Sequence, residues 1–231
     1  MRLLLMRHGQ THANVSGELD TAHPGADLTD LGRAQAAAAS RAIAGEDLDA
    51  IYVSSRVRTH QTAAPTARER GIEPTQLDGL EEIQAGDFEM RSDHDAVAGY
   101  IGTVAAWLEG DLARRMPGGE TGEEFLARFD TAVRTIVDAG HDAALVVSHG
   151  AALRTWVATR MEPHPDAPPA TQPLHNTALI VLEGDPDGGW RMVSWQGHPV
   201  GGTAPGAPDL EDPSAEDPTG DLDADGDGRV G

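Results

Sequence analysis

The sequence contains no cysteine, no lysine and no long apolar segment. Without cysteine the chain has neither disulfide bonds nor a thiolate, so any nucleophile must be a histidine, serine, threonine or carboxylate. No apolar run is long enough to cross a bilayer as a helix. The 17 basic residues, all arginine, face 38 acids, and the net charge of -21 argues against nucleic-acid partners and anionic membranes.

The amino terminus also lacks a targeting signal. Met1 leads directly into an apolar run, which leaves no room for a signal peptide, so we expect a soluble, cytoplasmic protein. A chain of 231 residues suits one α/β domain better than two. We place that domain at residues 1–200 and a separate tail at residues 201–231. No feature of the sequence indicates an oligomeric state.

The tail has the composition of a segment that does not fold. It carries nine acids and one arginine, a net charge of -8, in a background of glycine, proline and alanine. We therefore expect residues 201–231 to be disordered. Asp223, Asp225 and Asp227 resemble the opening of a calcium loop, but the closing glutamate is missing. A solvated acidic tail is the preferred interpretation, and weak binding of calcium or of a partner is the alternative.

Two segments share one design, a β-prone apolar run that ends in a histidine and a glycine. The first run ends in Arg7 and His8, and the second, residues 143–148, ends in His149 and is followed by a predicted helix at 151–157. An Arg-His pair alone is equally typical of a surface. If the two strands are neighbours, however, both imidazoles point into one pocket beside the amino end of a helix. That combination predicts a site for a phosphate-sized anion.

Hydrophobic periodicity and turn residues predict alternating strands and helices along the first 200 residues. The segment 93–115 has apolar positions at helical spacing, and we interpret it as core rather than as a lid over the pocket. A proline-rich loop covers residues 163–173. The other predicted helices are a helix that begins at Thr29 or Asp30 and continues to Ala44, and residues 57–70 and 122–139. The other predicted strands are residues 49–55, 77–82, 177–183 and 190–196.

The residues that could take part in catalysis or in ligand binding fall into five short motifs. They are Arg7-His8-Gly9-Gln10-Thr11 with Asn14; Ser54 with Arg58 and Gln61-Thr62-Ala63; Glu82; Pro117-Gly118-Gly119-Glu120; and Ser148-His149-Gly150. Each motif is weak alone, but in this order they resemble the motifs of the histidine phosphatase superfamily, also called phosphoglycerate mutase-like. The resemblance covers about residues 1–200. It implies a three-layer α/β sandwich in which helices cover both faces of a mostly parallel central sheet.

The resemblance also implies a role for each matching residue. His8 is the implied nucleophile, which carries the phosphoryl group to water while a backbone carbonyl holds its other ring nitrogen. Glu82 is the implied general acid and base, with a raised pKa beside the phosphate. The substrate is then a small phosphorylated metabolite, and neither a metal nor a cofactor is needed. The implied donors to the phosphate are the cationic or imidazole side chains of Arg7, Arg58 and His149, and, as neutral donors, Asn14 and the amides of Gly150 and Ala151.

Two alternatives concern the site itself. Glu81 is the neighbouring candidate for the acid, but Glu82 is the residue that matches the motif. A metal site built from His8, His12, His60 and a carboxylate is the second alternative. We favour the metal-free site because two nearby arginines would repel a cation.

Three functions are compatible with the motifs. Mutases of the family carry a Glu-Arg-His-Tyr stretch at the acid, whereas Glu82 is followed here by Ile83-Gln84-Ala85-Gly86-Asp87-Phe88-Glu89, which is closer to the phosphatases. Met90 departs from the family, which usually has glycine there. Arg114 and Arg115 could meet a second anionic group, although a solvated helix end is the simpler interpretation. We predict a phosphomonoesterase; the alternatives are a phosphoglycerate mutase and a catalytically idle module that binds a phosphorylated ligand.

Overall fold

The computed structural model describes residues 1–161 and 173–202. The predicted loop at 163–173, except for its last residue, and the tail beyond residue 202 lie outside these described residues. The core of the described chain is a six-stranded sheet with the order β3-β2-β4-β1-β5-β6. The strands are β1 (Arg2–Arg7), β2 (Ala50–Val53), β3 (Thr75–Gln76), β4 (Ala143–Ser148), β5 (Leu179–Asp185) and β6 (Gly189–Gln196).

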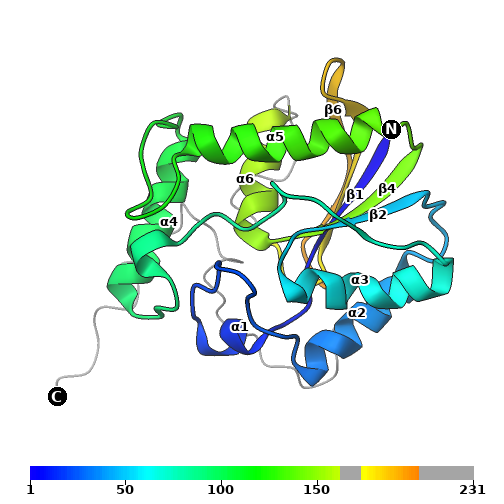
Figure 1. Ribbon diagram of the computed structural model, residues 1–231, viewed down its shortest axis with the longest axis horizontal. Coiled ribbons are helices and arrows are strands. Elements are labelled where there is room, and N and C mark those ends of the chain that lie inside the picture. Colours follow the sequence, from blue (N-terminus) through cyan, green and yellow to red (C-terminus); the bar gives the residue numbers. More distant parts are fainter. Residues whose placement is uncertain (162–172, 203–231) are drawn as a thin grey trace.

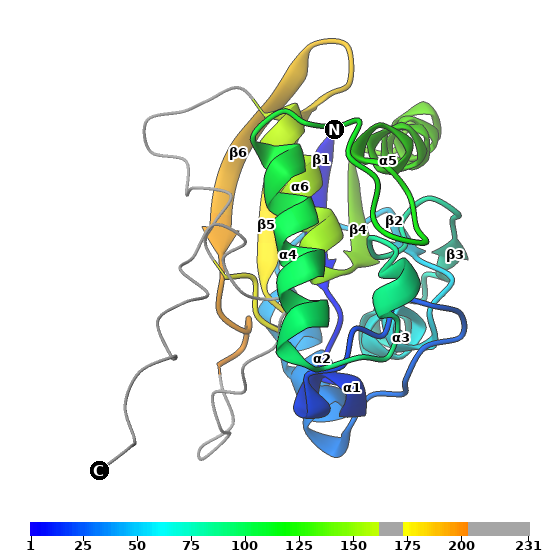
Figure 2. The same cartoon turned by 90° about the vertical axis from the view of Figure 1, so that its left-hand side faces the viewer.

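Helices cover both faces of this sheet (Figures 1 and 2). A short 3₁₀ turn, η1, spans Gly86–Phe88. The helices are α1 (His12–Ser16), α2 (Asp30–Ala42), α3 (Val57–Arg70), α4 (His94–Leu108), α5 (Gly122–Asp138) and α6 (Gly150–Arg160). Within the described residues, none of them combines the length and the apolar character needed to cross a membrane.

The alternation of side chains along β1 shows how the layers form. Leu3 and Leu5 belong to one buried cluster, which includes the apolar faces of α4, α5 and α6. Leu4 and Met6 belong to the other, which includes residues of α2 and α3. A strand that is buried on both sides needs apolar residues at every position, which explains the unbroken apolar run. The predicted three-layer sandwich is confirmed.

The four strands from β3 to β1 are parallel, and β5 and β6 are antiparallel to their neighbours. The predicted pairing of the two strand-His-Gly units is therefore correct, since β1 and β4 are adjacent and Arg7 lies opposite Ser148. In parallel neighbours the carboxyl ends meet at one edge of the sheet. His8 and His149 consequently leave the sheet at the same edge.

The strand predicted at 77–82 is wrong, since β3 contains only Thr75 and Gln76. Gly79 has φ +100°, which an extended strand cannot continue. The guanidinium of Arg128 then donates to the carbonyl oxygens of Gly79, Glu81 and Glu82. These carbonyls are satisfied by a side chain rather than by a neighbouring strand.

The helix predicted at 93–115 is also too long. Helix α4 ends at Leu108, and Gly110, with φ +102°, turns the chain away. Its apolar face packs as expected, with Ile101, Val104 and Trp107 buried in the core. The interpretation of this helix as core is therefore confirmed, although Tyr100 from the same helix also lines the pocket described below.

Candidate active site

The site begins where β1 and β4 end. The backbone amide of His8 donates to the Ser148 carbonyl at 3.0 Å, so pairing with β4 continues to the first histidine. A Cβ on Gly9 would lie 2.7 Å from the Gly32 carbonyl oxygen, so only glycine allows the chain to pass α2 at this distance. The imidazole of His8 is thereby brought within 5.2 Å, centroid to centroid, of the imidazole of His149.

The ring of His8 is oriented by its own backbone. Its Nδ1 lies 2.8 Å from the carbonyl oxygen of Gly9. A carbonyl only accepts, so Nδ1 carries the proton in the neutral ring and Nε2 carries the lone pair. Burial, and then the charges of Arg58 and Arg7, hold the pKa of His8 well below its ordinary value. His8 is therefore neutral at physiological pH and has the protonation state of a nucleophile.

The imidazole of His149 forms a hydrogen bond with the hydroxyl of Ser54, the residue that follows β2. Its Nε2 lies 2.8 Å from the Ser54 Oγ, which also lies 3.3 Å from the hydroxyl of Thr59. Its Nδ1 is buried and has no hydrogen-bond partner among the described residues. Burial, followed by the charge of Arg58, lowers the pKa of His149 well below its usual range. A neutral ring that accepts from Ser54 at Nε2 presents an N–H at Nδ1.

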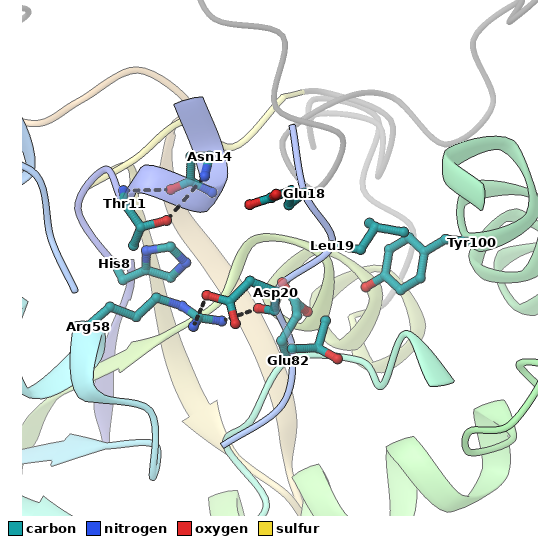
Figure 3. A pocket seen from close by; sticks show the side chains of 10 residues that line it. His8, Thr11, Asn14, Glu18, Leu19, Asp20, Arg58, Glu82 and Tyr100 are labelled. Atoms are coloured by element: carbon teal, nitrogen blue, oxygen red, sulfur yellow. Dashed lines mark hydrogen bonds and ion pairs between the residues drawn. The ribbon is translucent and has the colours of Figure 1, made fainter. Parts of the chain in front are cut away.

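Arg58 enters from the first turn of α3 and is 2% exposed. One terminal nitrogen donates to the Asp20 backbone carbonyl at 2.7 Å, and the other forms an ion pair with the Asp20 carboxylate at 3.3 Å (Figure 3). The Nε of Arg58 is buried without a hydrogen-bond partner among the residues described. This N–H and the Nδ1 of His149 are therefore buried polar groups that no described residue satisfies.

Glu82 lies on the opposite side of the same pocket (Figure 3). Its carboxyl accepts from the backbone amides of Ile83, Ala151 and Ala152 at 2.7 to 3.1 Å. Burial raises the pKa of Glu82, and these three amides oppose that shift only in part. A buried carboxyl with a raised pKa retains a proton more readily than an exposed one, as a general acid must.

Glu81, the rival acid, has a different environment. It binds the Ser55 hydroxyl and the Gly79 amide, at 2.8 and 2.7 Å. Burial alone would raise its pKa, but these hydrogen bonds and the nearby Arg128 lower the pKa of Glu81 on balance. It does not line the pocket, whereas Glu82 does. The environments of the two carboxyls favour Glu82 as the acid.

The three neutral donors implied by the motifs are placed differently. Asn14 lines the pocket, but its Oδ1 already accepts from Thr11 and Asn176, so only its Nδ2 is left to donate to a ligand. Gly150 is the first residue of α6. The amide of Ala151 donates to Glu82, a contact that the sequence did not predict.

The alternative metal site does not assemble in the described part of the chain. Residues 1–161 and 173–202 contain no group of three or more histidine and acidic side chains that could hold a metal ion. His12 is exposed on α1.

Several residues of the site carried no sequence signal. Asp20 pairs with Arg58, and Asn176 donates through Nδ2 to the His8 carbonyl at 3.1 Å. Arg128, which holds the carbonyl of Glu82, is itself paired with Glu120 at 2.7 Å. These contacts join positions far apart in the chain. Of them, only Glu120 lies in a recognisable motif, the Pro-Gly-Gly-Glu turn.

Comparison with known proteins identifies the group to which this arrangement belongs. The sequence profile of the histidine phosphatase superfamily (branch 1) matches residues 3–197. The chain belongs to the histidine phosphatase superfamily.

Several similar proteins come from mycobacteria. The PE-PGRS family protein PE_PGRS11 of Mycobacterium tuberculosis is 39% identical over 85% of this chain, which spans only 36% of that protein. The glucosyl-3-phosphoglycerate phosphatase of Mycolicibacterium vanbaalenii is 31% identical over 84% of this chain and 93% of its own length. The solved structure of the mycobacterial glucosyl-3-phosphoglycerate phosphatase has a TM-score of 0.70 at 26% identity, and covers 84% of this chain and 98% of that one. Phosphatases of small phosphorylated metabolites are thus among the homologues of this chain.

Proposed function

We propose that this histidine phosphatase hydrolyses small phosphomonoesters through a phosphohistidine on His8. The observation that carries the proposal is a pair of buried side-chain nitrogens near the His8 ring that have no partner in the described chain, namely the Nε of Arg58 and the Nδ1 of His149. Donors fixed in a dry site stabilise the charge on the equatorial oxygens of a transferring phosphoryl group. Arg7, which is fully buried at the end of β1, adds a second positive charge beside that of Arg58.

The first step transfers the phosphoryl group to the enzyme. The Nε2 lone pair of His8 attacks phosphorus, the bond to the ester oxygen breaks, and the carboxyl of Glu82 gives its proton to the departing alkoxide. In the second step a water attacks the phosphohistidine while the Glu82 carboxylate takes its proton. The N–P bond breaks, phosphate leaves, and both residues return to their starting protonation states. No metal and no cofactor takes part.

The test combines turnover with detection of the intermediate. Wild-type protein should hydrolyse p-nitrophenyl phosphate with or without a chelator, and His8→Ala should not. An alkaline quench during turnover should show phosphate attached to the peptide that contains His8. Turnover that persists in His8→Ala would contradict the proposal. Absence of turnover in the wild type, with phosphate still bound, would favour the idle binding module.

The second candidate is phosphoryl transfer of the mutase type, which uses the same histidine. The stretch after Glu82 favours hydrolysis because it lacks the Glu-Arg-His-Tyr sequence. An assay of 3-phosphoglycerate with a bisphosphate primer separates the two. Isomerisation faster than phosphate release would establish the mutase.

A further inference from the structure

The pocket in Figure 3 is lined by cationic, imidazole and acidic side chains. We place the phosphate at His8 and Arg58. The carboxylates of Glu18, Asp20 and Glu82 also line the pocket, and that of Asp20 forms an ion pair with Arg58 at 3.3 Å. Among the described residues, Arg58 is the one cation that lines it. We call Glu18 and Asp20 the acidic rim.

The acidic rim is fixed in place. The carboxylate of Glu89 accepts from both the amide and the hydroxyl of Thr21, the residue that follows the rim, at 2.8 and 2.5 Å. Between the two rim residues, Leu19 exchanges backbone hydrogen bonds with Met90 and Arg91. The side chain of Asp20 is 8% exposed. These contacts hold the backbone of the rim, while the carboxylate of Glu18 accepts from the Ser16 hydroxyl at 2.8 Å and that of Asp20 is paired with Arg58.

Three other arginines that could meet a second anionic group form contacts elsewhere. Arg56 donates to the Thr21 carbonyl at 2.8 Å, and Arg91 is paired with Asp93 at 2.7 Å. Arg115, once a candidate for a second anionic group, is paired with Glu124 on the surface. None of these three lines the pocket. A second negative charge on a substrate would therefore meet carboxylates rather than a guanidinium.

We propose that the acidic rim makes this enzyme select phosphomonoesters whose alcohol portion is uncharged or cationic, and reject those that carry a second anion. The proposal rests on the proposed hydrolysis, because it concerns the alcohol portion of the same substrate. Specificity of this kind comes from like charges placed against the unwanted ligand rather than from contacts to the preferred one. The Nε–H of Arg58, which has no partner in the described chain, can donate to the phosphate in either case.

Two substrates that differ at one group test the rim. Glycerol 3-phosphate and 3-phosphoglycerate differ in a hydroxymethyl group against a carboxylate. We expect the wild-type kcat/KM for glycerol 3-phosphate to exceed that for 3-phosphoglycerate by about tenfold or more, because like charges in an interface are strongly disfavoured. The Glu18→Gln/Asp20→Asn variant should reduce this ratio by about tenfold. Phosphoethanolamine should behave as the converse probe, with a kcat/KM that falls in the same variant.

The ratio cancels any effect that Asp20→Asn has on Arg58 and hence on both substrates. Glu18→Gln alone, which leaves Arg58 untouched, should move the ratio in the same direction. Glu109→Gln is the charge-matched control, since this exposed residue lies nine positions beyond Tyr100 on α4, about 14 Å along the helix axis. Its ratio should equal that of the wild type.

Each outcome decides one of the two proposals. Equal hydrolysis of both esters by the wild type, or a ratio unchanged in the double variant, would overturn the acidic rim. Failure to hydrolyse any phosphomonoester would refute the proposed function instead. In that case the thermal stabilisation of the wild type by each ester would test the acidic rim. If 3-phosphoglycerate stabilised the protein as much as glycerol 3-phosphate does, the acidic rim would be refuted as well.

Discussion

Strand β1 carries an arginine at each end, and the two have opposite surroundings. Arg2 is 30% exposed and is neutralised by Glu46 at 3.0 Å and Glu183 at 2.8 Å. The hydrogen bond to Glu46 is the main reason why the pKa of Arg2 is raised. At the other end Arg7 is fully buried, next to two histidines that burial keeps neutral.

The two ends of the sheet differ in whether the buried or partly buried nitrogens of their side chains have hydrogen-bond partners. At the amino end every strong donor of Arg2 has found a carboxylate, which suits a structural contact in water. At the carboxyl end of β1 and β4, the Nε of Arg58 and the Nδ1 of His149 are buried without a hydrogen-bond partner in the described chain. Buried, unsatisfied polar groups are unfavourable for stability, which distinguishes this end from the paired guanidinium of Arg2.

Replacing one arginine at each end gives the largest expected contrast. Arg58→Ala should lower kcat/KM by about 10³ to 10⁵, because a guanidinium on a transferring phosphoryl group has an effect of that size. Arg2→Ala should change kcat/KM by about twofold at most and the free energy of unfolding by about 1 kcal/mol or less, since its ion pairs are partly exposed to water.

The readouts for this pair are steady-state kinetics and thermal stabilisation by inorganic phosphate. Phosphate should stabilise Arg2→Ala as it does the wild type, and should not stabilise Arg58→Ala. An Arg58→Ala variant that is folded by circular dichroism and still gains stability from phosphate would remove the distinction between the two ends.

Glu82→Gln should have the next largest effect. A general acid accelerates a reaction by a factor of about 10² to 10⁴, so kcat for an alkyl phosphate should fall by about that factor. With p-nitrophenyl phosphate the leaving group needs no proton. The phenolate burst should therefore be slowed about tenfold or less, while the later hydrolysis of the phosphohistidine remains slow.

Glu81→Gln is the matched control for the neighbouring carboxyl. It should lower both rates equally if it acts at all, because Glu81 holds the Ser55 and Gly79 turn rather than a reacting atom. Equal losses for alkyl and aryl esters in Glu82→Gln would show that this carboxyl only braces the helix amides of Ala151 and Ala152.

The position of both histidines could be predicted because it depends on local patterns. An apolar run fixes a buried strand, a glycine ends it, and two such strands in parallel bring His8 and His149 to one edge. The first turn of α3 likewise places Arg58 there. The order of five motifs added the family and, through it, the three-layer fold.

The remainder depends on long-range contacts that leave no periodic signal. The segment after β3 has strand-like composition, but Arg128 takes three of its carbonyls and so replaces a neighbouring strand. The Asp20 carboxylate that pairs with Arg58 lies in a loop whose sequence resembles any polar turn. Asn176, which holds the His8 carbonyl, is 168 residues away along the chain.

Because His8 and His149 are neutral in the folded protein, the free energy of unfolding should depend on pH. The pKa of His8 is lowered in the folded protein relative to about 6.5 in the unfolded chain, so the unfolded state binds more protons between the two values. Stability should therefore be fully present above pH 6.5 and decrease as the pH falls, by about 1.4 kcal/mol per pH unit for this group. His8→Asn should lose less stability between pH 7.5 and 5.5 than the wild type does.

Urea unfolding at the two pH values measures this effect, with His94→Asn as the control. His94 is the matched control because it is exposed at the start of α4 and does not line the pocket. If His8→Asn and His94→Asn had the same pH dependence, the site would not hold His8 in its neutral form.

The smallest expected effect comes from backbone strain at Met90, a residue that takes no part in the proposed reaction. Met90, where the family usually has glycine, has φ +59° and is 52% exposed. A left-handed conformation is unfavourable for a residue with a Cβ by about 1 to 2 kcal/mol, part of which glycine returns through its freedom in the unfolded state. Met90→Gly should therefore raise the free energy of unfolding by about 0.5 to 1 kcal/mol.

Met90→Ala removes most of the side chain but keeps the Cβ, and with it the backbone strain. Comparison with Met90→Gly therefore separates the relief of backbone strain from the loss of the side chain. It should show no gain in a urea titration. Activity should stay within about twofold in both variants, because the hydrogen bond from the Met90 amide to the Leu19 carbonyl is made by backbone atoms alone. A stabilised Met90→Gly with altered substrate preference would show that this turn sets the position of the acidic rim, and that strain here belongs to the site after all.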